Sequence, residues 1–388
     1  MQFGLSESQQ ILKTNARKFF AAECPMSEVR RIMETDDAHD DKLWNHMAEQ
    51  GFLGVVYPEE AGGMGLGLVE LAALTEEMGR ALLPGAFIST LLAGSAIHAA
   101  GSEHHLAEIG SGSKKATLAL LEASANWDPS AVAMQVTNGN LTGEKMFVTD
   151  AGVADVIVVA ARDRGELALY AIDAKTAAQS GAATLSVMPA MDLTRRLHKV
   201  AFKGAKGELL ARGDAARKAL DHALDVATIA LCAEMTGGMQ RTMEIAVEYA
   251  KTRKQFGKPI GQYQAVQHQC ADMLVWTESS RSATYYAAWA MNEGIPEART
   301  AVSVAKVYAS DACREVGNRG VQVQGGMGFT WENDTHLFYR RAKASEIALG
   351  DATFHRERIA KLVIDHVGVK QAGVEQDNLA VAGAPVTV

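Results

Sequence analysis

Apolar residues recur at helical spacing through the first hundred residues of the chain. From Ser6 to about Leu106 this spacing appears in LWNHMAEQGFLGVV and LVELAALTEEMGRALL, and turn-forming runs such as YPEEAGGMGLG separate the segments. Residues three and four positions apart share one face of an α-helix, so each segment has an apolar face to bury. The pattern predicts an N-terminal helical domain over residues 1–115.

The pattern changes between residues 116 and 212. Short runs such as AVAMQVT, VADVIVVAA and LALYAI are rich in strand-forming residues, and Asn-Gly, Thr-Gly and Arg-Gly pairs punctuate them. We expect the pair Thr142-Gly143 to turn the chain into a strand that ends at Thr149. Because no helix-length segment separates the runs, they predict a small antiparallel β domain.

Helical periodicity returns from Asp214 to about Val367, in segments of twenty residues or more. Long helices that pack side by side form a bundle, which we expect over residues 213–370. The last residues, 371–388, lack a helical pattern and are predicted to form a flexible tail. The predicted fold class is therefore α+β, mainly α.

Composition and charge narrow the classes of partner. The chain has 388 residues and a formal net charge of −8, which argues against a nucleic acid or an anionic membrane as the main partner. The N-terminus shows no secretory pattern, and no apolar run reaches membrane-spanning length. We therefore expect a cytoplasmic protein in which an anionic ligand would be bound by locally placed arginines.

The cysteines indicate neither a disulfide framework nor a zinc site. They lack CxxC spacing, which is typical of thiols buried in a reducing compartment. No metal site is predicted from them. They are Cys24, Cys232, Cys270 and Cys313.

The first informative motif is AKTRKQFGKPIGQYQAVQHQCADM, residues 250–273. A helix is predicted to end near Arg253, and a Gly/Pro turn leads into a second helix. Arg253 could donate charge-assisted hydrogen bonds to a phosphate or pyrophosphate. The alternative is an arginine that simply favours a helix C-terminus because of the helix dipole.

Two further motifs are weak when taken alone. In GVQVQGGMGFTWENDTHLFYRRAK, residues 320–343, paired glycines allow another molecule to approach the backbone closely. Such a run is more often a turn, and it has neither the strand context of a dinucleotide fingerprint nor the lysine of a P-loop. The third motif, LTGEKMFVTDAGVADVIVVAAR, residues 141–162, is by itself a strand with turns.

Together, in this order and spacing, the three motifs resemble the acyl-CoA dehydrogenase family. PEEAGGMGLGLVELAALTEEMGR resembles that family's helical-domain signature as well, and the resemblance extends to about residue 367. It implies an N-terminal helical domain, a middle β domain and a C-terminal four-helix bundle. It also implies that FAD binds between the β domain and the bundle, partly across a subunit interface.

The resemblance assigns the FAD contacts residue by residue. Arg253 and Gln264 match the residues that reach the FAD pyrophosphate and adenosine, and Phe256 matches an aromatic contact. In the family, another segment approaches the FAD of the neighbouring subunit. The residues that match it here are Gln322, Gly325 and Gly326. A third group matches the strand that lies against the isoalloxazine ring and comprises Val148 and Thr149.

The family's reaction is the α,β-desaturation of an acyl-CoA thioester. A carboxylate removes the α-proton while the β-hydrogen leaves as hydride to flavin N5, and an electron-transfer flavoprotein is the expected electron acceptor. The α-proton is too weakly acidic for a carboxylate in water, so the thioester oxygen must be polarised and water excluded. Burial would also raise the pKa of the base towards that of the carbon acid.

This sequence departs from the family at the base. In most relatives the base is the glutamate of a Tyr-Glu-Gly-Thr segment, but an ungapped match places Leu349 there and Gly350 on the glycine. Other relatives carry the base on the first long bundle helix, twenty-six residues before the arginine matched by Arg253, and that position is Ala227. Both usual positions lack a carboxylate.

Three carboxylates are candidate replacements. Asp351 directly follows Gly350, although it is also a favoured N-cap for the helix that begins after it. Glu234 lies seven residues after Ala227 and so projects from nearly the same helix face, unless it is buried with a partner. Glu346 precedes Leu349 by three residues and is alternatively a surface or capping residue.

A second departure lies in the β domain. The family loop that holds the flavin is replaced by LLEASANWDPSAVAMQV, in which Glu122, Ser124 and Trp127 remain possible FAD contacts. These departures are similar to the branch whose hetero-oligomeric members act on bulky CoA thioesters such as steroid side chains. The chain could therefore be an enzyme or a non-catalytic, FAD-sharing subunit, in a homo- or hetero-oligomeric dimer of dimers. A flavin-dependent oxidase or oxygenase is a third reading.

Overall fold

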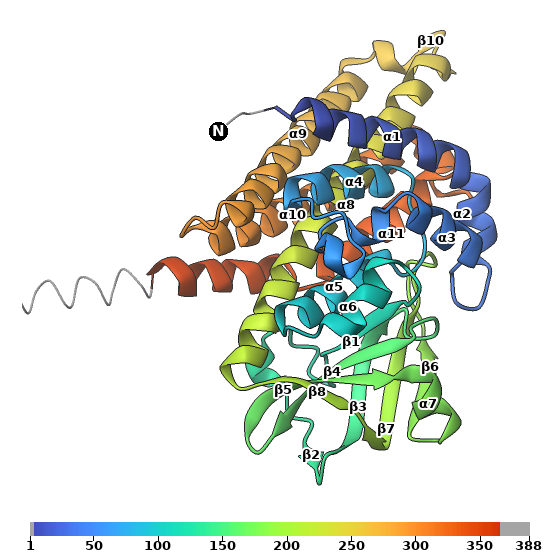
Figure 1. Cartoon of the computed structure of the whole chain (residues 1–388). Coiled ribbons are helices and arrows are strands. Elements are labelled where there is room, and N and C mark those ends of the chain that lie inside the picture. Colours follow the sequence, from blue (N-terminus) through green and yellow to red (C-terminus); the bar gives the residue numbers. More distant parts are fainter. Residues whose placement is uncertain (1–3, 365–388) are drawn as a thin grey trace, which may run out of the picture.

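The computed structural model describes residues 4–364, which form helical regions before and after a β region (Figure 1). The predicted tail, residues 371–388, lies outside the described residues. The mainly helical α+β fold with a central, largely antiparallel β domain is confirmed. Figure 1 shows the β region at one end of the molecule and the short hairpin with β10 at the other.

The N-terminal region consists of helices, as predicted. They are α1 (Glu7–Glu23), α2 (Met26–Met33), α3 (Asp41–Glu49), α4 (Leu68–Arg80), α5 (Phe87–Ala99) and α6 (Glu103–Gly110). Ser6 begins α1 with a capping box, because its side chain accepts the N–H of Gln9 and the Gln9 side chain accepts the N–H of Ser6. Their apolar faces bury Phe20, Trp44 and Leu71 in a common core.

The β region is a sandwich of two four-stranded sheets. One sheet has the order β1-β4-β5-β8 and the other has the order β2-β3-β7-β6. The first comprises β1 (Ala116–Ala119), β4 (Val156–Asp163), β5 (Glu166–Asp173) and β8 (Glu208–Arg212). The second comprises β2 (Val136–Thr137), β3 (Asn140–Thr149), β6 (Ala183–Met188) and β7 (Leu197–Lys206), and α7 (Ala174–Gln179) lies between β5 and β6 in the chain. Every pair is antiparallel except β1 with β4.

The continuous apolar run of β4 reflects burial on both faces. Ile157 and Val159 point into the core between the sheets, whereas Val158 and Ala160 pack in the core that includes α8. Successive side chains of a strand point to opposite faces, so a strand covered on both sides has no need of polar positions. The sheet is thereby attached to the helical part of the molecule.

The predicted turn at Thr142-Gly143 is wrong. β3 begins at Asn140 and continues through both residues, with a register shift between Leu141 and Thr142. The turn lies four residues earlier, where Asn138 (φ 53°) and Gly139 (φ 74°) connect β2 to β3. Two turn signals follow one another closely, and only pairing with β7 reveals that the second one is an irregularity within a strand.

The C-terminal region is built on long helices. They are α8 (Asp214–Thr252), α9 (Gln264–Asn292), α10 (Ala298–Gln324) and α11 (Thr335–Ile347), and residues 352–364 are also helical. The hairpin of β9 (Lys254–Gln255) and β10 (Lys258–Pro259) joins α8 to α9. At 1.5 Å per residue, the 39 residues of α8 span about 58 Å. This one helix reaches from the β region to the hairpin.

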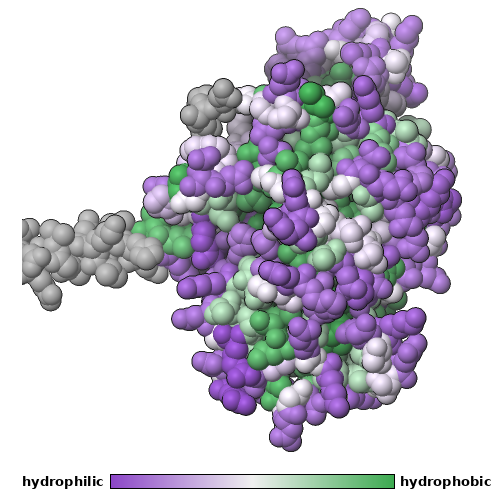
Figure 2. All heavy atoms as spheres, viewed as in Figure 1, coloured by the Kyte–Doolittle hydropathy of each residue, from purple (hydrophilic) through white to green (hydrophobic). Residues whose placement is uncertain are grey.

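All four cysteines are free; three are buried and Cys270 is partly exposed. Within residues 4–364, the helices are too short or too polar to span a bilayer. The face drawn in Figure 2 is mostly hydrophilic, with apolar patches between the polar side chains.

Candidate active site

A cavity of about 210 Å³ lies beside Leu349. Leu224 and Thr228 of α8 line it; they lie one turn apart and bracket Ala227 in sequence. Trp127, from the divergent loop of the β region, lines it as well. The two positions at which relatives carry a base therefore lie at or next to the same cavity, with a leucine at one and a buried alanine at the other.

The carboxylates near this cavity are mostly held by basic side chains. Asp225 is buried and accepts from Arg299 Nε at 2.9 Å, and its other oxygen lies 2.6 Å from an Arg358 nitrogen. Asp221 accepts from Arg217 Nε at 3.0 Å. Both carboxylates are therefore already paired with arginine side chains.

The cavity itself is lined by three carboxylates, Asp221, Asp128 and Glu357. Asp128 lies 3.8 Å from Arg217 and 3.9 Å from Lys361. Glu357 is exposed, on the helical segment 352–364. Sequence reasoning passed over these residues because nothing in their spacing relates them to Leu349.

The backbone next to Leu349 is held from two sides. The buried Lys306 ammonium donates to the carbonyls of Ser345 (3.1 Å), Glu346 (2.9 Å) and Gly350 (2.9 Å). His355 Nε2 lies 3.0 Å from the Leu349 carbonyl and must carry the proton of that hydrogen bond. Burial lowers the pKa of Lys306 and lowers that of His355 to about 4. Leu349 itself has a φ of +58°, which few non-glycine residues adopt.

Asp351 caps a helix. Its Oδ1 accepts the backbone N–H of Phe354 at 2.8 Å, as an N-cap side chain does. The residue is exposed and does not line the cavity beside Leu349, although Phe354 and His355 do. The capping alternative is thereby confirmed.

Glu234 lies in a buried ion-pair network with Arg195, Arg341 and Asp192. Arg195 lies 2.7 and 2.6 Å from its two oxygens, and Arg341 donates to one of them. Arg341 also donates to Asp192 at 2.6 Å. Burial lowers the pKa of Arg341, but the attraction of Asp192 and Glu234 outweighs it and raises the pKa overall.

The surroundings of Glu234 and Glu346 separate both from the Leu349 cavity. Glu234 borders a different cavity, of about 20 Å³. Glu346 on α11 pairs with Arg314 at 2.6 Å and with Lys343 at 2.8 Å. None of the three expected replacements for the base faces the cavity at Leu349.

The residues expected at the FAD pyrophosphate lie at the far end of α8 and are open to another molecule. Arg253 follows α8 directly, is exposed and forms no ion pair with any residue between 4 and 364. The Phe256 side chain is 92% exposed, which is rare for an aromatic side chain. Gln264 is exposed at the first position of α9.

The glycine segment after α10 is also open. Gln322, Gly325 and Gly326 are exposed, and a Cβ added at either glycine would meet nothing within 4 Å. Gly325 has a φ of +60°, which favours glycine. The segment therefore fits the expected approach of a bulky cofactor.

The residues expected at the isoalloxazine ring lie at the end of β3. Val148 is buried, and the carbonyl of the half-buried Thr149 accepts from Thr117 Oγ1 at 2.6 Å. Phe147 precedes them and is 37% exposed, with a φ of +55°. It was not singled out from the sequence, although an exposed aromatic beside Val148 is a natural surface for a flat ring.

The divergent loop is fixed by a buried lysine. Lys145 Nζ, fully buried, donates to Glu122 at 2.7 Å. Glu122 in turn accepts the N–H groups of Ala133 (3.1 Å) and Met134 (2.9 Å). Glu122 therefore holds the loop, while Ser124 is exposed.

The expected FAD contacts do not gather at one place in the chain. Val148 and Thr149 belong to the β region, whereas Arg253, Phe256 and Gln264 surround the hairpin at the opposite end of the molecule (Figure 1). α8 contacts β5 and β8 of the β region as well as β10 and the turn after the hairpin. Much of the length of α8 separates the two groups of expected contacts.

The chain is similar to known proteins over most of its length. Two family models match, "Acyl-CoA dehydrogenase, N-terminal domain" over residues 6–109 and "Acyl-CoA dehydrogenase, C-terminal domain" over residues 217–364. Acyl-CoA dehydrogenase IpdE2 of Mycolicibacterium smegmatis is 31% identical over 360 residues, which cover 92% of this chain and 98% of that protein.

Two solved structures are also similar. A variant of the Tcur3481-Tcur3483 steroid ACAD has a TM-score of 0.83 at 28% identity, covering 93% of this chain and 99% of that chain. The ChsE4-ChsE5 complex from Mycobacterium tuberculosis has a TM-score of 0.83 at 27% identity, covering 93% of this chain and 98% of that chain.

The helical regions before and after a β sandwich, with a cavity at Leu349, are the framework of an oxidoreductase that acts on the CH–CH group of acyl-CoA thioesters. The chain belongs to the acyl-CoA dehydrogenase family.

Proposed function

We propose that this chain serves the FAD-dependent α,β-desaturation of an acyl-CoA thioester as one subunit of a hetero-oligomer whose other chain provides the catalytic base. The observation that carries the proposal is the cavity at Leu349. Of the three carboxylates that line it, Asp128 and Asp221 are paired with arginine or lysine, and Glu357 is exposed. The usual base positions hold Leu349 and Ala227.

The chain's own residues would bind and orient the cofactor. FAD, when bound, accepts the β-hydrogen of the substrate as hydride. Arg253 would hold the pyrophosphate by charge-assisted hydrogen bonds, because its guanidinium is exposed and without an ion-pair partner among residues 4–364. Thr149 and Val148 would border the ring, and Gln322 with its adjoining glycines would approach the FAD of a neighbouring chain.

The separation of these groups supports an oligomer. A second chain must bring its hairpin to the β region of the first if each FAD is to meet both groups. Large apolar side chains are exposed on α9 and around the segment that follows α10, which a single chain leaves uncovered. They include Leu274, Val275, Met327, Phe329 and Trp331.

The substrate we propose is a bulky, steroid-derived CoA thioester, and the proposed electron acceptor is an electron-transfer flavoprotein. The proposal of a steroid substrate rests on the similarity to a protein described as a steroid ACAD. The hetero-oligomer has a parallel in the ChsE4-ChsE5 complex. A reducing, cytoplasmic location is compatible with four free cysteines.

Co-expression tests the proposal. The chain is purified alone and with a dehydrogenase-like partner, and anaerobic bleaching of the flavin by steroid CoA thioesters is followed. We expect bleaching only in the co-expressed complex, and unchanged rates when this chain carries Asp351→Asn or Glu357→Gln. Full bleaching by the chain alone, abolished by one of these changes, would assign the base to that residue instead. Rapid reoxidation of the bleached flavin by air would favour the oxidase reading.

A further inference from the structure

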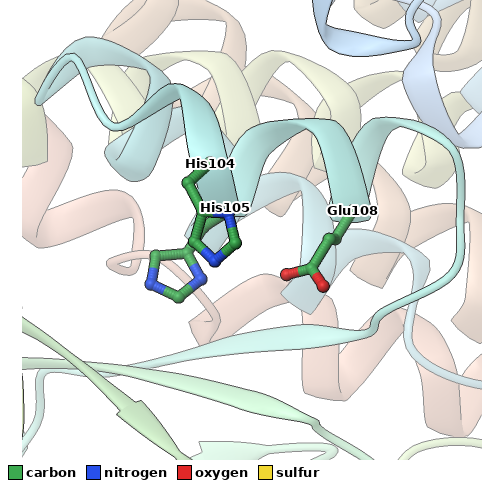
Figure 3. Close-up of side chains that lie close together, drawn as sticks. All are labelled: His104, His105 and Glu108. Atoms are coloured by element: carbon green, nitrogen blue, oxygen red, sulfur yellow. The ribbon is translucent and has the colours of Figure 1, made fainter.

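Two histidines and a glutamate converge on the surface of α6. His104, His105 and Glu108 each present one possible ligand atom, and the three atoms lie within 4.8 Å of one another. Figure 3 shows both imidazoles on the same side of the helix, with the Glu108 carboxylate directed towards them from the next turn. Within residues 4–364 no other group brings three metal-ligating side chains this close.

The spacing and the ligand types point to a transition metal. Glu108 follows the histidines by four and three positions, which places side chains next to one another on a helix. Imidazole nitrogen combined with carboxylate oxygen suits Zn²⁺ and its neighbours, whereas Ca²⁺ and Mg²⁺ prefer oxygen ligands alone.

His105 is already oriented as a metal ligand would be. Its Nε2 lies 3.1 Å from the Glu208 carboxylate of β8. A carboxylate only accepts, so Nε2 carries the proton and Nδ1 of the neutral ring keeps its lone pair. Nδ1 is buried and has no hydrogen-bond partner among the described residues. Metal-bound histidines usually donate their second ring N–H to a carboxylate, as His105 does to Glu208.

The distances are within reach of a bound ion. Ligand atoms around tetrahedral Zn²⁺ lie about 3.4 Å apart, because the metal–ligand bonds are about 2.0–2.1 Å long. The three atoms must therefore approach one another by about 1.4 Å at most. His104 is exposed and free to rotate by that amount.

Lys114 competes with a metal ion for Glu108. Its Nζ pairs with Glu108 Oε2 at 2.7 Å, so a metal must compete for that oxygen or use the other one.

We propose that His104, His105 and Glu108 bind one Zn²⁺-class divalent cation, with water completing the shell and Glu208 orienting His105. The ion would join α6 of the helical region to β8 of the β region through the His105–Glu208 contact. This role is independent of the Leu349 cavity and of FAD. The site was not predicted from the sequence, because only the spacing of the cysteines was considered as a signal of metal binding.

The experiment uses the full chain without a histidine tag, stripped of metal by a chelator. Zn²⁺ is titrated by calorimetry, and Co²⁺ serves as a spectroscopic probe of tetrahedral coordination. We expect one equivalent to bind. His104→Gln and Glu108→Gln each remove a direct ligand and should weaken binding at least as much as loss of an outer-shell partner does, which is about 10- to 100-fold. Lys114→Met should tighten binding, because it removes the competing charge.

A matched control is His46→Gln. His46 on α3 also pairs with a glutamate, Glu23 at 2.8 Å, but no third ligand is near, so this change should leave the affinity unaltered. The proposal is overturned if the unmodified chain binds Zn²⁺ no more tightly than the His104→Gln/Glu108→Gln double variant. It is equally overturned if alkylation of the cysteines abolishes binding that these changes leave intact.

Discussion

Leu349 closes a cavity in which a proton acceptor would be expected. The leucine side chain cannot take up a proton, but the surrounding backbone is held in place by Lys306 and His355. The Lys306 ammonium lies beside the Gly350 carbonyl, so its charge would favour the ionised form of a carboxylate introduced nearby. At the scale of single residues, both usual base positions hold side chains that cannot accept a proton, Leu349 and Ala227.

Leu349→Glu should therefore restore base function to the chain itself. We expect the rate of anaerobic flavin bleaching to rise by about 100-fold or more, in line with the contribution of a positioned general base. Burying the new carboxylate costs stability, so flavin content and the unfolding midpoint are measured in parallel. Leu349→Gln matches the size without the charge and should stay inactive; equal rates for the two variants would contradict the interpretation.

Glu234→Gln should destabilise the fold rather than act on chemistry alone. The change removes a buried charge shared by Arg195 and Arg341. Breaking such a pair from one side costs about 3–5 kcal/mol of the free energy of unfolding, measured with urea. Glu244→Gln on the same helix is the control. The Glu244 side chain pairs with Arg80 and is 30% exposed, so this change should lower the free energy of unfolding by at most about 1 kcal/mol. Unchanged stability with lost flavin reduction would instead indicate a catalytic Glu234.

His355 should make stability depend on pH. Burial lowers its pKa from 6.5 to about 4, so between these values the unfolded chain binds a proton that the folded chain does not. Stability is therefore full above about pH 6.5 and is lost as the pH falls towards 4, by about 3 kcal/mol in total. Other buried histidines add to this slope, so the free energy of unfolding is compared with that of His355→Gln. A variant with the same slope as the unmodified chain would contradict the assignment.

α8 is the element that relates the parts of the molecule. Its first turns meet β5 and β8, its middle carries Ala227 and Glu234, and Arg253 follows its last residue. Its 22 buried residues explain why it runs on without interruption, since it packs against other helices along most of its length. The helix thus places the base position and the expected pyrophosphate contact far apart in one rigid body.

The helix at residues 352–364 should depend on the cap supplied by Asp351. Asp351→Ala should lower the free energy of unfolding by about 1 kcal/mol, whereas Asp351→Asn keeps an acceptor and should change it by only a few tenths. Both variants should retain the rate of flavin bleaching in the co-expressed complex. Loss of bleaching in the folded Asn variant would show that the carboxylate acts as the base.

At the scale of the whole molecule, the expected FAD contacts lie towards opposite ends, and we propose that a second chain brings them together. Flavin retention should therefore depend on association. Arg253→Ala should reduce the flavin bound per chain, and dilution should release flavin as the oligomer dissociates. Arg241→Ala, on the exposed face of the same helix, should have no effect. Flavin that stays bound to an isolated monomer would contradict the two-chain site.

The sequence alone determined the order of the three regions, the helix ends around the hairpin and the absence of a base at Leu349 and Ala227. These features depend on local periodicity, turn chemistry and motif spacing, which a chain carries in neighbouring residues. Local signals also misled: Thr142-Gly143 has the composition of a turn, but pairing with β7 makes it part of a strand.

Only the tertiary structure decided which carboxylates are paired with a basic side chain. Glu234 and Arg341 are 107 residues apart, and Asp225 and Arg299 are 74 apart, so no spacing rule predicts either pair. His105 and Glu208 are likewise far apart in the sequence, 103 residues, and only the fold brings them together. A side chain is free or held according to what the fold packs against it, and burial makes that distinction energetically large.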